Sequence, residues 1–184
     1  MKIGLRAGHS PNCLGAVGLR NEHKSMMEFF AYVREVFENY NHTVIDCNSN
    51  ANSPNTELYE GVVKANNAGV DLFISLHMNS CNGQAFGTEA LTYGEDSRAN
   101  SYAKNLLINF SKLGFFNRGL KFQPTYFEMK NVKAPNIIFE VCFCDSKKDI
   151  DIWSKLTWEQ LAYAFGNSID SNIPFNPSKE ANKV

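Results

Sequence analysis

Four residues of this 184-residue chain combine a reactive side chain with a place beside or inside an apolar run. His9 follows the first such run, and His77 ends the run DLFISLH. Glu22 begins a helical pattern, and Glu140 lies inside the run NIIFEVCF. Imidazole and carboxylate groups are common zinc ligands, and a buried carboxylate is a candidate for proton transfer. These four residues are the first candidates for a site.

The two histidines are predicted at one edge of a sheet, because each lies where a strand ends. A lone histidine after a strand is more often a hydrogen-bonded structural residue than a ligand. Two histidines at the same edge make metal binding as strong an interpretation as a structural role. His42 precedes its strand, so we expect it at the opposite edge.

Each carboxylate has an ordinary explanation beside the functional one. Glu22 at a helix start complements the helix dipole, but it can also reach the two histidines, with His23 as the rival ligand. Burying a lone carboxylate such as Glu140 is costly unless it is paired, metal-bound or protonated. An ion pair with Lys or Arg is one explanation of Glu140. A catalytic carboxylate with a shifted pKa is the other, and its wholly apolar neighbours favour this second explanation.

The elements that must position these residues alternate between strands and helices. We therefore expect a single α/β domain with a twisted, largely parallel mixed sheet and helices on both faces. Strands are predicted over 2–6, 42–47, 71–77, 87–93, 118–122 and 136–143. Helices are predicted after the cap Asn21, after Ser53 or Asn55, over 102–113 and after a Thr157–Gln160 capping box.

Composition narrows the classes of protein that fit. Hydrophobic residues make up 43% and charged residues 20%, and the net charge is −1, which indicates a globular protein without the basic face of a nucleic-acid binder. No apolar run reaches the length of a membrane span, and the start MKIGLRAG does not resemble a signal peptide.

Five cysteines without a CxxC pair argue against a disulfide framework. Cys142 and Cys144 share a strand face and are expected to be buried structural thiols rather than metal ligands.

Several polar residues are weaker candidates. Glu89 alternates with apolar residues, so we expect it on a half-exposed strand face, and Asp145 is expected to cap a following helix or turn. Tyr93, Arg118 and Tyr126 are candidates for a substrate groove, although single residues of this kind usually lie on the surface.

The order of the segments carries a resemblance to a known family. RAGHS, GLRNE, SLHMNS, GTEALTY and IIFEVCFCDSKKD follow one another between Lys2 and Ile169. In this order they resemble the motifs of the zinc-dependent N-acetylmuramoyl-L-alanine amidases. The chain looks most like the catalytic domain of a phage endolysin that acts on a Gram-positive host.

The resemblance implies a zinc ion held by His9, Glu22 and His77, with Glu140 as the catalytic carboxylate. The implied substrate is peptidoglycan, cleaved between N-acetylmuramic acid and L-alanine. The chain departs from the family at Arg6-Ala7, where an acidic residue or Pro is usual, and at Cys144-Asp145, where Ser-Asn is usual. These departures concern the surroundings of the ligands and the contacts with substrate.

The resemblance also carries expectations about organisation and place of action. Residues 1–172 are expected to form the catalytic domain. Residues 173–184 are expected to be a linker or tail, compatible with a wall-binding domain that follows in a longer protein. The protein is expected to be made in the host cytoplasm and to act on the wall after release. No feature of the sequence fixes an oligomeric state.

Two other functions use the same residues. A zinc peptidase that cuts within the stem peptide would need the same ligands. A non-catalytic wall-binding module with a structural zinc ion would need a fourth protein ligand, and Cys13 is the nearby candidate.

Overall fold

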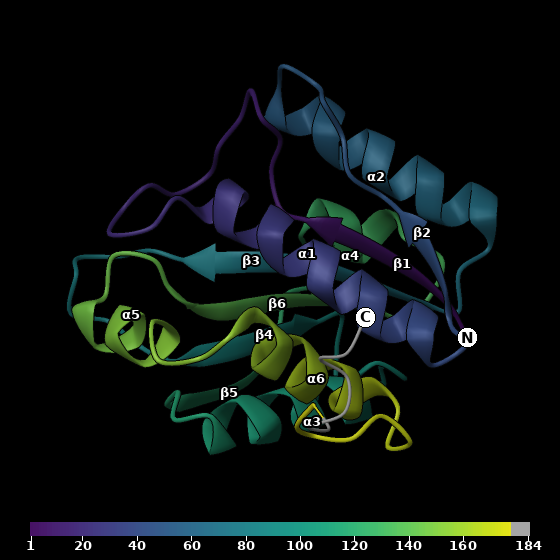
Figure 1. The fold of residues 1–184 in the computed structure, drawn as a ribbon. Coiled ribbons are helices and arrows are strands. Elements are labelled where there is room, and N and C mark those ends of the chain that lie inside the picture. Colours follow the sequence, from purple (N-terminus) through teal and green to yellow (C-terminus); the bar gives the residue numbers. More distant parts are fainter. Residues whose placement is uncertain (178–184) are drawn as a thin grey trace.

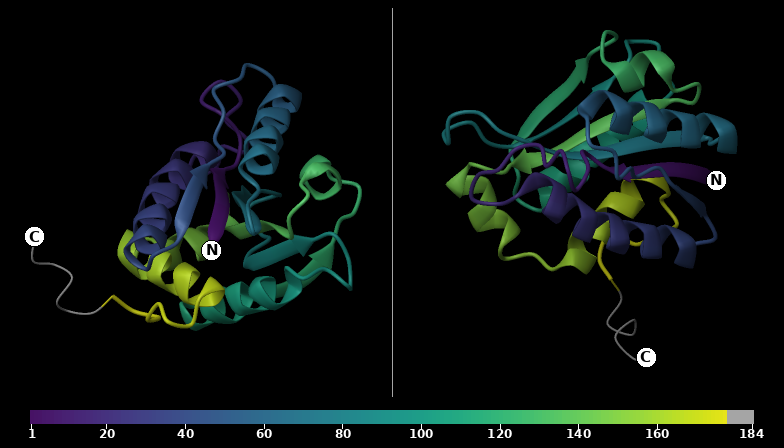
Figure 2. Two further views of the ribbon diagram at one scale, coloured as in Figure 1. Left: turned by 90° about the vertical axis from the view of Figure 1, so that its right-hand side faces the viewer. Right: turned by 90° about the horizontal axis from the view of Figure 1, so that it is seen from above.

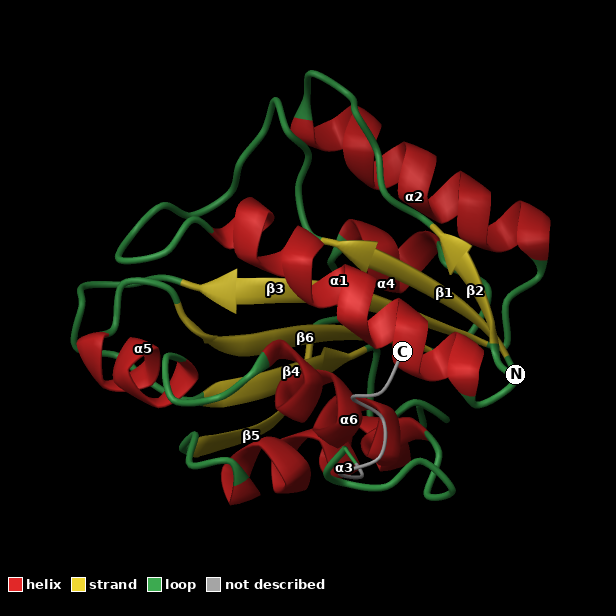
Figure 3. Cartoon of the chain, in the orientation of Figure 1, coloured by secondary structure: helices red, strands yellow, loops and turns green. Residues whose placement is uncertain are grey.

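The structure is a computed structural model and describes residues 1–177. Its centre is a six-stranded sheet with the strand order β2-β1-β3-β6-β4-β5 (Figure 3). The strands are β1 (Lys2–Ala7), β2 (Thr43–Asp46), β3 (Leu72–Asn79), β4 (Thr88–Thr92), β5 (Asn117–Phe122) and β6 (Asn136–Phe143). Each of the six lies where the sequence predicts a strand.

Strand direction confirms the predicted mixed, largely parallel sheet. β1 runs parallel to both β2 and β3, and β3 runs parallel to β6. β4 is antiparallel to β6 and parallel to β5. Four adjacent strands therefore end at the same edge of the sheet, where α/β proteins bind their ligands.

Within residues 1–177, six helices accompany this sheet. They are α1 (Glu22–Asn39), α2 (Pro54–Ala68), α3 (Asn100–Lys112), α4 (Phe127–Asn131), α5 (Lys147–Trp153) and α6 (Trp158–Ile169). α1, α3 and α6 cover one face, whereas α2 and α4 lie against the other (Figures 1 and 2). This confirms the prediction of helices on both faces.

The two faces of the sheet differ in how they are filled. Phenylalanine rings dominate the face under α1, α3 and α6, where Phe139 of β6 packs 4.8 Å from Phe110 and 5.8 Å from Phe165 between ring centroids. The opposite face holds a much smaller apolar cluster around Phe73. Because strand side chains alternate between faces, the residues between the core positions of β1, β3 and β6 point to this second, more polar face.

Local signals in the sequence explain where the longer helices begin. The Asn21 side chain accepts a hydrogen bond from Lys24 N, and Ser53 accepts one from Thr56 N. Thr157 and Gln160 form the predicted capping box. These side chains satisfy amide groups that the first helical turn leaves free.

Two short helices and one cap differ from the sequence predictions. α4 and α5 have only five and seven residues, too few to display a helical period. The prediction that Asp145 is a cap is wrong, because Ser146 caps α5. Asp145 instead accepts hydrogen bonds from Cys81 N and Gly83 N, which fixes the loop after β3.

The C-terminal residues are described only in part. Ile173 is buried in the core under α6, and residues 178–184 lie outside the described part. The assignment of 173–184 as a linker or tail remains a prediction. None of the helices in the described part has the length and apolar character needed to cross a membrane.

Candidate active site

Three predicted ligands meet at the carboxyl edge of the sheet. His9 Nε2 lies 3.2 Å from one oxygen of Glu22, and His77 Nδ1 lies 2.9 Å from the other. One ligating atom from each of the three residues falls within 4.8 Å of the others. The structure therefore brings together side chains that are separated by up to 68 residues in the sequence.

Two glycines make this close approach possible. Gly8 and Gly15 flank the turn that carries His9, and a Cβ atom at Gly8 would overlap the ring of His77. At Gly15 a Cβ atom would overlap the His9 ring and the Glu22 carboxylate, and the backbone there has a φ of 69°. His9 itself has a φ of 71°, a conformation that histidine adopts more readily than most residues. The turn is thus shaped to aim the ring over the sheet edge.

Glu22 is held as a buried, ionised carboxylate. It accepts hydrogen bonds from Ala16 N at 2.7 Å and from Met78 N at 3.1 Å. Burial by itself would raise the pKa of Glu22, but hydrogen bonds and charge from His77 and His9 outweigh it and hold the pKa well below its usual value. A permanent negative charge at this position favours a cation between the rings.

The pKa of His77 is also shifted by the charges around it. Burial by itself would lower the pKa of His77, but the hydrogen bond to Glu22 and the negative charges of Glu140 and Glu22 raise it to about 9. The other ring nitrogen of His77, Nε2, lies 3.0 Å from Ser75 Oγ. The ring therefore has one nitrogen toward Glu22 and the other toward a hydroxyl group, an arrangement seen around metal-binding histidines.

The donor set fits a zinc ion with an open position. Two imidazole nitrogens and one carboxylate are a known catalytic combination, whereas structural zinc sites use four protein ligands. Cys13 lines the same pocket but does not belong to the cluster of ligating atoms within residues 1–177. The wall-binding alternative with Cys13 as fourth ligand gains no support from this geometry.

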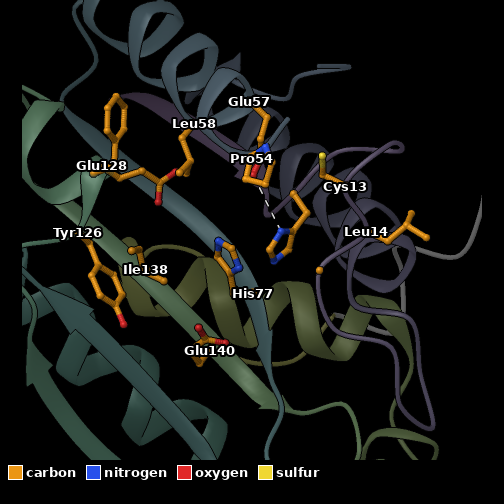
Figure 4. A pocket seen from close by; sticks show the side chains of 13 residues that line it. Cys13, Leu14, Pro54, Glu57, Leu58, His77, Tyr126, Glu128, Ile138 and Glu140 are labelled. Carbon is orange, nitrogen blue, oxygen red and sulfur yellow. Dashed lines mark ion pairs between the residues drawn. The ribbon is translucent and has the colours of Figure 1, made fainter. Parts of the chain in front are cut away.

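Glu140 lies beside these ligands and points into the same pocket (Figure 4). Its neighbour across the ladder from β3 is His77. Glu140 Oε2 is buried without a hydrogen-bond partner, and no Lys or Arg of the described part forms an ion pair with this residue. Burial raises the pKa of Glu140 to about 7, with Glu22 and Glu89 adding to the rise and His77 opposing it. The structure thus argues against the ion-pair explanation.

A pocket of about 630 Å³ opens in front of these residues, a size typical of ligand sites. Leu14 lies on one side of it, with Tyr126 and Ile138 on the opposite side (Figure 4). Pro54 and Leu58 of the α2 region complete a largely apolar wall. The pocket therefore combines the polar side chains of His9, His77 and Glu140 with apolar walls that a ligand can contact.

The remaining histidines lie outside the ligand cluster. His23, the rival of Glu22, has Nδ1 3.1 Å from the backbone oxygen of Gly8 and does not join the cluster. His42 lies at the other end of the molecule, with Nε2 3.0 Å from Asp170, which confirms its predicted separation from the site.

The weaker polar candidates have mixed outcomes. The expected half-exposed position of Glu89 is wrong, because this carboxylate is buried between Arg118 and Lys121 at 2.7 and 2.6 Å. Arg118 is therefore paired with Glu89, and it is not among the residues that line the pocket beside the ligands. Tyr126 lines the pocket, whereas Tyr93 lines a different one.

Three charged residues near the ligands were not among the predicted site residues, although Arg6 was identified in the sequence as a departure from the family. Arg6 is fully buried and forms ion pairs with Glu57 at 2.5 Å and Glu128 at 2.9 Å. Glu57 also approaches His9 Nδ1 to 4.0 Å. Both glutamates stand in first turns of helices, where acidic residues are ordinary. The signal that points to them is an arginine inside an apolar strand, since such a charge needs buried partners.

Comparisons with solved structures agree with this geometry. The catalytic domain of the CD27L endolysin, which targets Clostridium difficile, superposes with a TM-score of 0.87 at 28% identity and covers 96% of this chain and 99% of that chain. Cwp6 from Clostridium difficile has a TM-score of 0.83 at 22% identity, over 94% of this chain and 29% of that chain. The amidase AmiC2 of Nostoc punctiforme has a TM-score of 0.82 at 20% identity, over 94% and 96%. The last two likenesses bear on the fold.

Sequence comparisons lead to the family. Two uncharacterized proteins of Clostridium perfringens are each 33% identical to this chain, over 157 and 178 residues. They are matched over 83% and 94% of this chain but over only 47% and 52% of their own lengths, so the chain spans about half of these relatives. The family model for N-acetylmuramoyl-L-alanine amidases matches residues 3–171. The chain therefore belongs to the N-acetylmuramoyl-L-alanine amidase family.

Proposed function

We propose that this protein is a zinc-dependent hydrolase that cleaves the amide between N-acetylmuramic acid and L-alanine in peptidoglycan. The observation that carries the proposal is one pocket lined by His9, His77 and Glu140, in which Glu22 contacts both histidines and Glu140 Oε2 has no partner. A metal-ligand set with an open position, next to a carboxylate that can exchange a proton, is what amide hydrolysis requires.

The three ligand side chains would hold the zinc ion through His9 Nε2, His77 Nδ1 and the Glu22 carboxylate, since these atoms face one another. When bound, zinc supplies a Lewis acid that polarises the scissile carbonyl group and lowers the pKa of a water molecule. Glu22 is fixed by two backbone amides, so it is positioned before any ligand arrives.

Glu140 acts as the general base and then as the general acid. Its carboxylate can take a proton from the attacking water and return it to the leaving nitrogen of L-alanine. Burial, which raises the pKa of Glu140 above its ordinary value, favours the proton-accepting step. Oε2 is free to make these transfers because no side chain of the described residues occupies it. The apolar strand around Glu140 keeps the carboxylate desolvated and so maintains the raised pKa.

The setting of this reaction is the bacterial cell wall. The likeness to the CD27L endolysin catalytic domain supports an endolysin role against a Gram-positive wall. In that role the protein is made in the host cytoplasm, reaches peptidoglycan after release and is antimicrobial. Residues 1–172 would supply the catalytic activity.

The test is hydrolysis of purified Gram-positive cell walls, with zinc analysis of the protein and a chelator arm. We expect one zinc ion per chain, wall lysis that stops in chelator and returns with zinc, and products with free muramic lactyl ends and new L-alanine amino termini. New termini elsewhere in the stem peptide would assign the protein to the zinc peptidases. Lysis that continues in chelator, with no zinc bound, would contradict the proposed metal centre.

A further inference from the structure

A buried arginine is connected to the proposed metal ligand His9 through Glu57, which contacts both residues. Arg6 lies in β1 on the sheet face toward α2 and α4, and none of its surface is exposed. Gly61 of α2 provides the space, because a Cβ atom there would come within 3.2 Å of Arg6 Nη1. A charged group is placed here at a high desolvation cost, so its partners matter.

The partners of Arg6 are two glutamates from different helices. Arg6 Nη2 donates to Glu57 Oε2 of α2 at 2.5 Å, and Nη1 donates to Glu128 Oε1 of α4 at 2.9 Å. Both carboxylates are almost fully buried, with 3% of each side chain exposed. Two carboxylates and one guanidinium leave a net negative charge beside the site.

The two glutamates differ in one respect. The second oxygen of Glu57, Oε1, faces His9 Nδ1 at 4.0 Å, and this contact is the dashed line beside Glu57 in Figure 4. Glu128 makes no ion pair with either histidine of the cluster within the described residues. Glu57 and Glu128 therefore form a matched pair in which only one member meets a ligand ring.

The two ring nitrogens of His9 thus face different groups. Nε2 points to Glu22 and Nδ1 points to Glu57. At 4.0 Å the Glu57 contact is longer than a hydrogen bond, and a small turn of the ring or one bridging water closes it. The His9 side chain is 27% exposed, so the loop leaves room for such a turn.

We infer that Glu57, held in place by Arg6, is a positioning residue for His9. When the metal is bound, Glu57 accepts a hydrogen bond from Nδ1–H, which leaves the Nε2 lone pair for the metal. Carboxylates that accept the outer N–H of a ligand histidine fix the tautomer and orientation of the ring. This inference rests on the proposed role of His9 as a zinc ligand.

The test compares Glu57→Gln with Glu128→Gln, since each removes one buried charge from Arg6. In Glu57→Gln the amide oxygen must serve Arg6 Nη2, so the amide NH₂ group turns toward His9 Nδ1 and disfavours the Nδ1–H tautomer. We expect zinc affinity, measured by competition with a chromophoric chelator, to fall about 10- to 100-fold in Glu57→Gln. Glu128→Gln should bind zinc within about threefold of the unaltered chain.

The hydrogen bond at Nδ1 gives a readout that a merely structural role would not move. In the zinc-loaded protein, ¹⁵N NMR of the His9 ring should show a hydrogen-bonded Nδ1–H in the unaltered chain and in Glu128→Gln, and a weakened Nδ1–H hydrogen bond in Glu57→Gln. Thermal melts of each metal-free variant establish that it is folded. Should Glu57→Gln not fold, Glu57→Asp keeps the charge for Arg6 but withdraws the carboxylate from His9, and it should weaken zinc binding by at least about threefold.

The unaltered chain and His9→Ala, measured in parallel, separate this inference from the proposed function. If the unaltered chain binds no zinc, or His9→Ala binds it equally well, the metal centre is wrong and the inference falls with it. If His9→Ala loses zinc but both Glu57 variants bind it as tightly as Glu128→Gln, only the inference is overturned. Equal weakening in Glu57→Gln and Glu128→Gln would also overturn it, because the effect would belong to the charge network as a whole.

Discussion

His77 and Glu140 are direct partners across the β3–β6 ladder, and both side chains line the same pocket. A parallel ladder fixes the spacing of such partners through backbone hydrogen bonds. The proposed base is therefore set relative to one metal ligand by the sheet itself. Neither group depends on a loop for its placement, in contrast to His9.

Replacing Glu140 by Gln should separate chemistry from metal binding. The amide keeps the size of the side chain but cannot take a proton, so we expect wall hydrolysis to fall by about 10²- to 10⁴-fold. Zinc content and thermal stability of the loaded protein should remain those of the unaltered chain. Release of L-alanine amino termini from purified walls is the measurement. A Glu140→Gln protein with full activity would remove the role given to this residue.

Replacing His77 by Ala should abolish stoichiometric zinc binding. In the unaltered chain, free zinc at about 100 times its Kd should add about 2.7 kcal/mol to the free energy of unfolding, and this gain should vanish in His77→Ala. Thermal melts with and without zinc measure the difference. His42→Ala is the control, because His42 binds Asp170 far from the site and its loss should leave the zinc effect intact. Zinc stabilisation that survives in His77→Ala would show that the ligand set is wrong.

The metal-free protein should lose stability as the pH rises. Burial places the pKa of Glu140 at about 7 in the folded protein against 4.5 as the ordinary value, so the folded state binds more protons between these values. The stabilising contribution is complete below the lower value and is lost as the pH rises through the upper one. His77, with a pKa raised from 6.5 to about 9, acts in the same direction at higher pH.

This pH dependence can be measured by urea unfolding of chelator-treated protein at about pH 5 and about pH 8. Glu140→Gln should show a smaller loss of stability between the two, since the contribution of Glu140 is removed and His77 loses one of the charges that raise its pKa. Identical losses in the two proteins would mean that Glu140 does not carry the shifted pKa.

Gly15→Ala should damage the site through its backbone. A left-handed φ costs a non-glycine residue about 1–2 kcal/mol, and the added Cβ atom would also overlap the His9 ring and the Glu22 carboxylate. We expect zinc affinity to fall by at least about tenfold. Gly69→Ala is a matched control, with a φ of 60° and no atom within 4 Å of the added Cβ. It should show the backbone cost alone and bind zinc normally, and equal zinc affinities in the two variants would contradict the steric explanation.

The candidate site residues could be singled out because several of them have an unusual setting in the sequence. Glu140 is a lone carboxylate within eight residues that form a strand, and His77 ends another apolar run. The parallel topology then places their strand ends together, and this follows from the alternation of helices and strands. What the sequence could not supply was the register, and only the structure sets Glu140 beside His77 rather than beside Ser75.

Glu57 and Glu128 show where such reasoning fails. Each is an acidic residue in the first turn of a helix, a pattern that the helix dipole explains without any burial. Which way a helix side chain points depends on how the helix docks, and α4 is too short to reveal an apolar face. The sequence does show that Arg6 differs from the residue usual in the family at this position. The two buried ion pairs that Arg6 forms explain this difference.

The strand order has a consequence for how the protein is synthesised. His9 follows β1, Glu22 begins α1 and His77 lies in β3, so all three proposed ligands come from the N-terminal part of the chain. The proposed base arrives on β6, about sixty residues later along the nascent chain, and completes the ladder beside β3. A ribosome-bound intermediate would therefore hold every metal ligand while still lacking the group that moves the proton. All three proposed metal ligands are therefore synthesised before the proposed base.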